Sequence, residues 1–279
     1  MPETSTSPAR ADRGWYVYGF IPPGHAPQSA QPAGVDETSA VTILEHAGIA
    51  AIVSEVPLDD FGEEGLRRNL NDSAWLEAKV RRHEAVLETF VGSDALIPLR
   101  FSTIYRSTDQ LRAALGEEHD RLAAALAHVR GKREWGVKAF SDDAALGAWI
   151  ERTDERAGRL REQIAASPAG SAYFARKKLE QVLREEGAEL AAECARRVHE
   201  VVAAAASEAR ANRPQRKEVS GHEGAMILNG AYLVERKRED EFAATAAEVA
   251  SRYAELGISM DVTGPWPPYN FVPDALQAA

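Results

Sequence analysis

Seven histidines and one cysteine are the residues from which this chain could build a metal site or a nucleophile. No histidine falls in an H-E-x-x-H motif, and the pair His222-Glu223 has no third ligand at a suitable spacing. We therefore predict no metal ion and no catalytic residue. The histidines are scattered along the chain: His25, His46, His83, His119, His128, His199 and His222.

The best placed of these groups share helical faces with apolar residues. His83 falls on one stripe with Leu76, Val80, Leu87 and Phe90, so we interpret it as a half-buried packing residue. His119-Asp120 also suggests a metal ligand or a base, but it has no companion ligands.

Cys194 lies on the apolar stripe of an Ala-rich helix. A nucleophilic thiol needs an electropositive, partly open setting, and the nearby Arg196 does not face Cys194, because neighbours one or two along a helix point elsewhere. We predict that Cys194 is buried by packing.

The composition excludes several classes of function. The chain has no G-x-x-x-x-G-K-[ST] or G-x-G-x-x-G motif, so we predict no bound cofactor. A net charge of −10 disfavours a nucleic-acid binder. One cysteine allows no internal disulfide, which suits a reducing cytoplasm. The chain has no run of about 18 apolar residues, so we predict no membrane span, and its polar start does not resemble a signal peptide.

The first part of the chain, residues 13–131, predicts one α+β domain. Trp15–Phe20 is apolar on both faces, which is typical of a central strand. Residues 41–57 predict a hairpin with its turn near Gly48. A helix should follow over 76–90, then a strand over 96–105, then a helix that begins at a capping box on Ser107 and ends at Gly131.

The second part, residues 132–279, predicts another α+β domain. Strands are expected at 134–140, 226–235 and 258–263, with a helix over 242–256. Residues 142–212 are rich in Ala, Glu and Arg and predict a hairpin of two helices outside the sheets. The second helix, if continuous, would be roughly 60 Å long, so it must pack on its neighbour or bend near Gly187. Each domain thus predicts an antiparallel or mixed sheet covered by helices, with a split βαβ, ferredoxin-like character.

The segment GPWPPYNFV, residues 264–272, is the most unusual feature of the sequence. Its prolines fix the backbone, so it should form a stiff, extended strap after the last strand. We expect Trp266 to pack against the second domain, and the Tyr269 hydroxyl to meet a backbone group or water. Together with Phe271, these residues either seal that domain, which we favour, or contact a partner.

Four segments carry a resemblance to the gas vesicle protein F/L family: YVYGF at the start, IPLRFSTIY with Arg100 in the middle, MILNGAYLVERKREDEF, and GPWPPYNFV. Their order and spacing match over most of the chain from Trp15 to Val272. The last segment is the most specific. The chain departs from the family pattern P-x-R-F-G-T by having Ser102 in place of glycine.

The resemblance implies a non-enzymatic accessory protein of gas vesicles with two α+β domains. Such proteins are minor vesicle components or assembly factors in the cytoplasm. They contact the small, very hydrophobic shell protein and other accessory proteins. The resemblance leaves open whether the chain is of the F or the L type, and which surface binds the shell protein.

Two other classes of function stay open beside this one. One is a chaperone-like adaptor or protein-binding module unrelated to vesicles, which would use the long helical pair as its docking surface. The other is an enzyme with a site built from dispersed residues such as Arg100, Tyr269 and His119. Genomic neighbourhood distinguishes the adaptor from the vesicle protein. A deep polar pocket with shifted titratable groups would favour the enzyme. The oligomeric state is open in every case.

Overall fold

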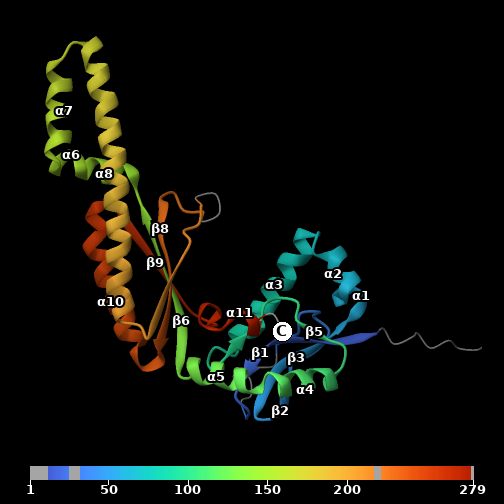
Figure 1. Cartoon of the computed structure of the whole chain (residues 1–279). Helices are drawn as coiled ribbons and strands as arrows, with labels where there is room; N and C mark the ends of the chain where they lie inside the picture. The colour runs from blue at the N-terminus through green and yellow to red at the C-terminus, as the bar shows by residue number, and fades with distance from the viewer. Residues whose placement is uncertain (1–11, 25–31, 217–220, 278–279) are drawn as a thin grey trace, which may run out of the picture. The chain divides into compact units, whose positions relative to one another are not determined.

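The computed structural model describes residues 12–24, 32–216 and 221–277 (Figure 1). Their contacts divide the chain into two compact units. The first unit contains the described residues up to Arg133 together with those from Trp266 onward, and the second contains Glu134–Pro265. Among these described residues, no helix has both the length and the apolar character needed to cross a bilayer.

The sheet of the first unit is antiparallel and has β1 (Arg13–Ile21) at its centre. β3 (Ile49–Pro57) pairs with one side of β1, and β2 (Thr42–His46) pairs with β3. The other side of β1 pairs with β4 (Ile97–Pro98) and β5 (Ile104–Tyr105). Both faces of β1 are buried, which confirms the prediction of a central strand.

The hairpin between β2 and β3 turns at Ala47 and Gly48, as predicted. Both residues have positive φ, 49° and 79°, the backbone of the two-residue turn that matches the twist of paired strands. The expected strand over 96–105 is wrong in its extent, because only its two ends pair with β1. Between them the chain turns at Ser102, whose φ is 79°.

Six helices belong to the first unit as described: α1 (Leu58–Phe61), α2 (Glu63–Asn69), α3 (Ser73–Glu88), α4 (Thr108–Glu117), α5 (His119–Val129) and α11 (Asp274–Gln277). Asp72 caps α3 by accepting hydrogen bonds from the first free backbone N–H groups, and Ser107 does the same for α4. The single helix predicted after Ser107 is divided in two at Glu118. The buried face of α3 covers the sheet with His83, Val86 and Leu87.

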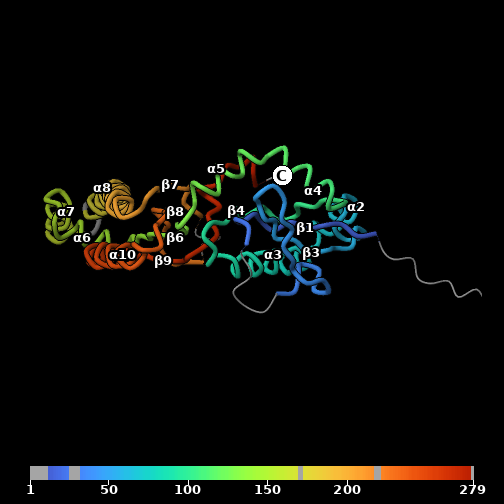
Figure 2. The backbone as a smooth tube through the Cα atoms, turned by 90° about the horizontal axis from the view of Figure 1, so that it is seen from below, coloured from blue at the N-terminus to red at the C-terminus, as the bar shows by residue number. Residues whose placement is uncertain are grey.

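The second sheet has the order β7 (Glu208–Asn212), β8 (Ala225–Glu235), β6 (Lys132–Ser141) and β9 (Ile258–Trp266), which Figure 2 shows nearly end-on. The prediction of helix throughout residues 142–212 is wrong at its end, where β7 is a strand. Its sequence, EARAN, has no preference for strand, so pairing with β8 imposes the extended form. The two sheets covered by helices confirm the predicted α+β class.

The helices of the second unit are α6 (Asp143–Thr153), α7 (Glu155–Ala166), α8 (Ala169–Ala204) and α10 (Glu239–Tyr253), and short 3₁₀ turns span Arg236–Arg238 and Ala254–Leu256. The structure thus has three helices where two were expected, because Asp154 ends α6 and caps α7. α8 has 36 residues and is about 54 Å long at 1.5 Å per residue. α7 packs along one part of it and α10 along another (Figure 1).

Cys194 is buried in the core between α8 and the second sheet, as predicted. Burial raises the pKa of its thiol, so the reactive thiolate is disfavoured. Phe242, Val249 and Tyr232 belong to the same core.

Candidate functional site

The C-terminal segment, residues 266–277, belongs by its contacts to the first unit, whereas the sequence predicts it in the second. Phe271 is 2% exposed, and Val272 and Leu276 are buried beside it. Trp266, which the sequence predicts to pack against the second domain, is 42% exposed and therefore only partly packed. The buried anchor of the segment is Phe271 instead, in a 3₁₀ turn that spans Tyr269–Phe271.

Tyr269 fixes the segment by its hydroxyl group. The hydroxyl donates to the Glu84 carboxylate at 3.0 Å, in addition to a longer bond with a backbone carbonyl, the kind of partner that the sequence suggested. It also lies 3.4 Å from the carbonyl of Leu99 and 3.4 Å from Nε2 of His83. Burial raises the pKa of Glu84, although the bond from Tyr269 opposes that shift.

His83 links this contact to the core. Its Nε2–H donates to the Leu99 carbonyl at 3.0 Å, because a carbonyl can only accept. Nδ1 therefore accepts from the Tyr16 hydroxyl at 2.9 Å, and that hydroxyl accepts from the backbone N–H of Ser102 at 3.0 Å. Burial lowers the pKa of His83 to about 4, so the ring is neutral at pH 7. The residue is fully buried rather than half-buried, and both ring nitrogens make hydrogen bonds within the core.

Arg100 and Gln277 hold the end of the segment. The Arg100 backbone N–H donates to the Gln277 carbonyl at 2.9 Å. The Gln277 side chain donates to the carbonyls of Tyr269 and Val272, each at 2.7 Å. The Arg100 guanidinium lies 2.6 Å from Asp274 in an exposed ion pair, which contributes little to stability. Arg100, Tyr269 and Phe271 are thus brought together as anchors of the C-terminal segment.

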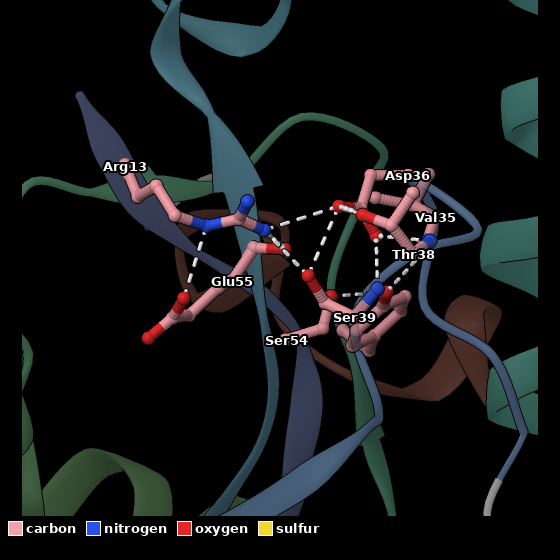
Figure 3. Close-up of polar contacts among 8 residues, drawn as sticks. Arg13, Val35, Asp36, Thr38, Ser39, Ser54 and Glu55 are labelled. Atoms are coloured by element: carbon pink, nitrogen blue, oxygen red, sulfur yellow. Dashed lines mark hydrogen bonds and ion pairs between the residues drawn. The ribbon is translucent and has the colours of Figure 1, made fainter. Parts of the chain in front are cut away.

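A second polar cluster, which was not predicted from the sequence, ties the loop before β2 to the sheet (Figure 3). Asp36 accepts from the Thr38 hydroxyl at 2.6 Å and from the Ser39 backbone at 3.0 Å, and Arg13 pairs with it at 3.2 Å. Burial alone would raise the pKa of Asp36, but the bonds from Thr38 and Ser39 outweigh it and lower that pKa. The D-x-T-S pattern of residues 36–39 could have indicated this cluster, because Asp side chains often accept hydrogen bonds from backbone N–H groups two or three residues further along.

Tyr18 completes this cluster from the core side. Its hydroxyl accepts from the Val35 N–H at 2.7 Å and meets the Ser54 hydroxyl at 2.8 Å. Burial raises the pKa of Tyr18 to about 12. Each polar group of the cluster has a partner within the fold, so the cluster holds the loop in place.

The three residues considered for an enzyme are engaged in separate contacts. His119 is exposed and lies 2.9 Å from its neighbour Asp120, while Tyr269 bonds Glu84 and Arg100 pairs with Asp274. No set of three or more His, Cys, Asp or Glu side chains in residues 12–24, 32–216 and 221–277 could hold a metal ion.

The larger grooves lie in the second unit, away from these groups. One of about 790 Å³ runs between α6 and α8 and is lined mainly by small residues, including Gly147, Gly187 and Ala191. Groups with strongly shifted pKa values lie in the two cores instead: His83 and Tyr18 in that of the first unit, and Tyr232 in that of the second.

Comparison with known proteins agrees with this fold over nearly the whole chain. The family model described as "Gas vesicle synthesis protein GvpL/GvpF" matches residues 14–273. Gas vesicle protein L of Streptomyces sp. (strain CB03234) is 33% identical over 93% of each chain. Gas vesicle protein L1 of Halobacterium salinarum is 26% identical over 98% of this chain and 96% of its own.

A crystal structure of GvpF from Anabaena sp. PCC7120 has the same fold. It superposes with a TM-score of 0.65 at 20% identity and covers 94% of this chain and 96% of its own. The chain therefore belongs to the gas vesicle synthesis protein GvpL/GvpF family and has an accessory role in gas vesicles.

Proposed function

We propose that this protein binds the small, strongly apolar shell protein of gas vesicles, as a non-enzymatic assembly factor or minor vesicle component. Family membership supports the vesicle role. The proposal also includes contact with other vesicle accessory proteins and a place in the cytoplasm at the growing vesicle.

Strand β9 is the observation that carries the proposal. β9 is the last strand in the order of the described second sheet, and edge strands can accept an added strand from another chain. Ile258 at the start of the strand is buried, with 2% of its surface exposed. Val262 near its other end is 39% exposed. An uncovered aliphatic residue on an edge strand suits a partner that is itself apolar.

The opposite edge of the same sheet differs in character. β7 presents Glu208, Arg210 and Asn212, and such polar and charged residues discourage strand addition. We therefore assign the shell-protein contact to β9. Trp266 ends this strand with its side chain 42% exposed, and we propose it as a contact residue in its own right.

The relatives favour the L type over the F type. In Streptomyces sp. (strain CB03234), gas vesicle protein L is 33% identical to this chain and gas vesicle protein F is 28% identical. In Halobacterium salinarum the corresponding values are 26% for L1 and 21% for F1. We infer that the chain fills the role of an L protein.

Co-expression with the shell protein tests the proposed contact. The tagged full-length chain is captured, and the shell protein that copurifies is quantified by mass spectrometry. Val262→Lys should reduce capture about tenfold or more, because it places a desolvated charge against an apolar partner.

Ala211→Lys on β7 is the matched control, since it adds the same charge to the opposite, equally accessible edge. Capture should survive that change. Equal capture by the wild type and Val262→Lys would show that β9 is not the contact. Absence of capture by the wild type would contradict the proposed shell-protein contact and leave only the broader accessory role that family membership supports.

A further inference from the structure

The tip of the α7–α8 hairpin exposes two aromatic side chains. Phe174 is 74% exposed and Tyr173 is 59% exposed, more than any other large apolar side chain in the described residues. Their rings lie 5.6 Å apart in an edge-to-face arrangement. Ala172 and Ala175 bury the opposite side of the same turn against the hairpin, so both rings are held outward on a rigid helix.

Three basic residues follow directly on the same helix: Arg176, Lys177 and Lys178. All three are exposed. Lys177 is four residues after Tyr173 and Lys178 four after Phe174, so each lysine lies next to an aromatic ring on the helix surface. The first turn of α8 has no acidic residue, so nothing there offsets the positive end of the helix.

Several other cations of the hairpin, by contrast, make ion pairs. Arg156 pairs with Glu186 at 2.5 Å, Arg161 with Glu151 at 3.0 Å, and Arg196 with Glu193 and Glu200. Within residues 12–24, 32–216 and 221–277, none of Arg176, Lys177 and Lys178 makes an ion pair. A chain with a net charge of −10 thus concentrates unpaired positive charge beside its most exposed aromatic rings.

A shallow groove of about 480 Å³ continues from this tip along the hairpin. Lys178 lines it from α8, and Arg156 and Arg159 line it from α7. Its floor includes the buried apolar pair Leu160 and Val182. Glu185 also lines the groove, and its carboxylate accepts from the Gln181 amide at 2.9 Å.

We propose that the tip and groove of the α7–α8 hairpin bind an acidic, amphipathic segment of a partner protein. Carboxylates of that segment pair with Lys178, Arg176 and Lys177, and its apolar side chains cover Phe174 and Tyr173. This site lies on other elements than β9 and goes beyond the proposed shell-protein contact.

The shape of the site favours a protein segment over a lipid surface. The groove is concave and runs along two antiparallel helices, which suits an elongated helix or strand laid into it. A membrane-binding face would instead present a broad apolar stripe, and here the apolar surface is limited to two rings at one end.

Binding of a defined peptide to the full-length protein tests the proposal. The probe is a fluorescein-labelled synthetic peptide of Leu and Glu arranged as an amphipathic helix, measured by fluorescence anisotropy. The variant Arg176→Gln/Lys177→Gln/Lys178→Gln should weaken binding about tenfold, because each exposed ion pair that is lost lowers the affinity by a small factor and the three factors multiply. Phe174→Ser should weaken it about threefold or more.

The matched control removes three exposed arginines of the first unit, Arg67→Gln/Arg81→Gln/Arg112→Gln, and should bind like the wild type. All these side chains are exposed, so the fold tolerates their loss. Equal weakening by the two triple variants would show general electrostatic attraction and overturn the proposal. An unchanged affinity in Phe174→Ser would overturn it as well.

Two further probes separate other occupants. Phosphatidylglycerol vesicles that bind the protein through the same residues, when the peptide does not bind, would assign the tip to lipid. A fluorescein-labelled second copy of the chain that binds through the same residues, when the peptide does not, would assign it to self-association. Both results would contradict the proposal.

Discussion

Replacing Phe271 with alanine should destabilise the first unit, although this residue lies near the other end of the chain. Phe271 is 2% exposed and belongs by its contacts to the first unit. Loss of a buried phenylalanine side chain typically costs about 3–5 kcal/mol of unfolding free energy, through lost burial and the cavity left behind. We expect a loss in that range.

Trp266 provides a contrast within the same segment. It is the larger residue, but 42% of its surface is already exposed, and no closed cavity would remain after its removal. We therefore expect Trp266→Ala to cost less than Phe271→Ala, roughly 2–3 kcal/mol, in proportion to the smaller area it buries. With Trp266 packed against the second domain, as the sequence predicts, the expected cost of this change is roughly 3 kcal/mol.

Urea unfolding with linear extrapolation gives the change in free energy, and hydrogen exchange localises it. In Phe271→Ala, amides of β1 should lose protection, while those of β8 in the second unit should keep theirs. Equal costs for the two variants would refute the assignment of Phe271 as the anchor. Loss of protection in β8 alone would show that the segment belongs to the second unit.

Three further changes probe the same region by stability measurements. Ser102→Gly should stabilise the protein by about 0.5–1 kcal/mol in urea unfolding, because Ser102 has a φ of 79° that glycine adopts without strain. Tyr269→Phe should destabilise it by about 1–2 kcal/mol, since Glu84 loses its hydroxyl donor. Stability should also fall as the pH drops from 6.5 towards 4, because the unfolded state then protonates His83 and the folded state does not. NMR titration of the His83 ring should show it neutral down to about pH 4.

Elements specified by local patterns were predictable from the sequence. The apolar run from Trp15 to Phe20 is the central strand, because a strand buried on both faces needs apolar residues at every position. Gly48 marks the hairpin turn, since its positive φ favours glycine. The stripe around Leu87 is the buried face of α3.

Elements imposed by distant partners were not predictable in this way. Strand β7 has a helix-favouring composition and is extended only because it pairs with β8. The return of the C-terminal segment to the first unit depends on contacts of Tyr269 with Glu84, which are 185 residues apart. The exposed tip at Phe174 was likewise not recognised, because aromatic residues within a helical pattern usually face a core.

At Ser102 the family's sequence pattern and the backbone geometry of this structure explain each other. A glycine at this position of the pattern suggests a backbone that favours positive φ, and the structure has that backbone with serine in place. Serine is accommodated at this positive φ because hydrogen bonds on both sides of the turn fix its backbone. The Ser102 N–H donates to Tyr16, and the flanking strands β4 and β5 both pair with β1.

Site-specific photo-cross-linking in vesicle-forming cells tests the proposed shell-protein contact most directly. A photoreactive amino acid is placed at Val262 on β9 or, as the control, at Ala211 on β7, and cross-linked products are identified by mass spectrometry. If β9 is the contact, we expect a product of this chain with the shell protein from position 262 and little or none from position 211. Shell-protein products from position 211 alone, or from neither position in cells that form vesicles, would contradict it.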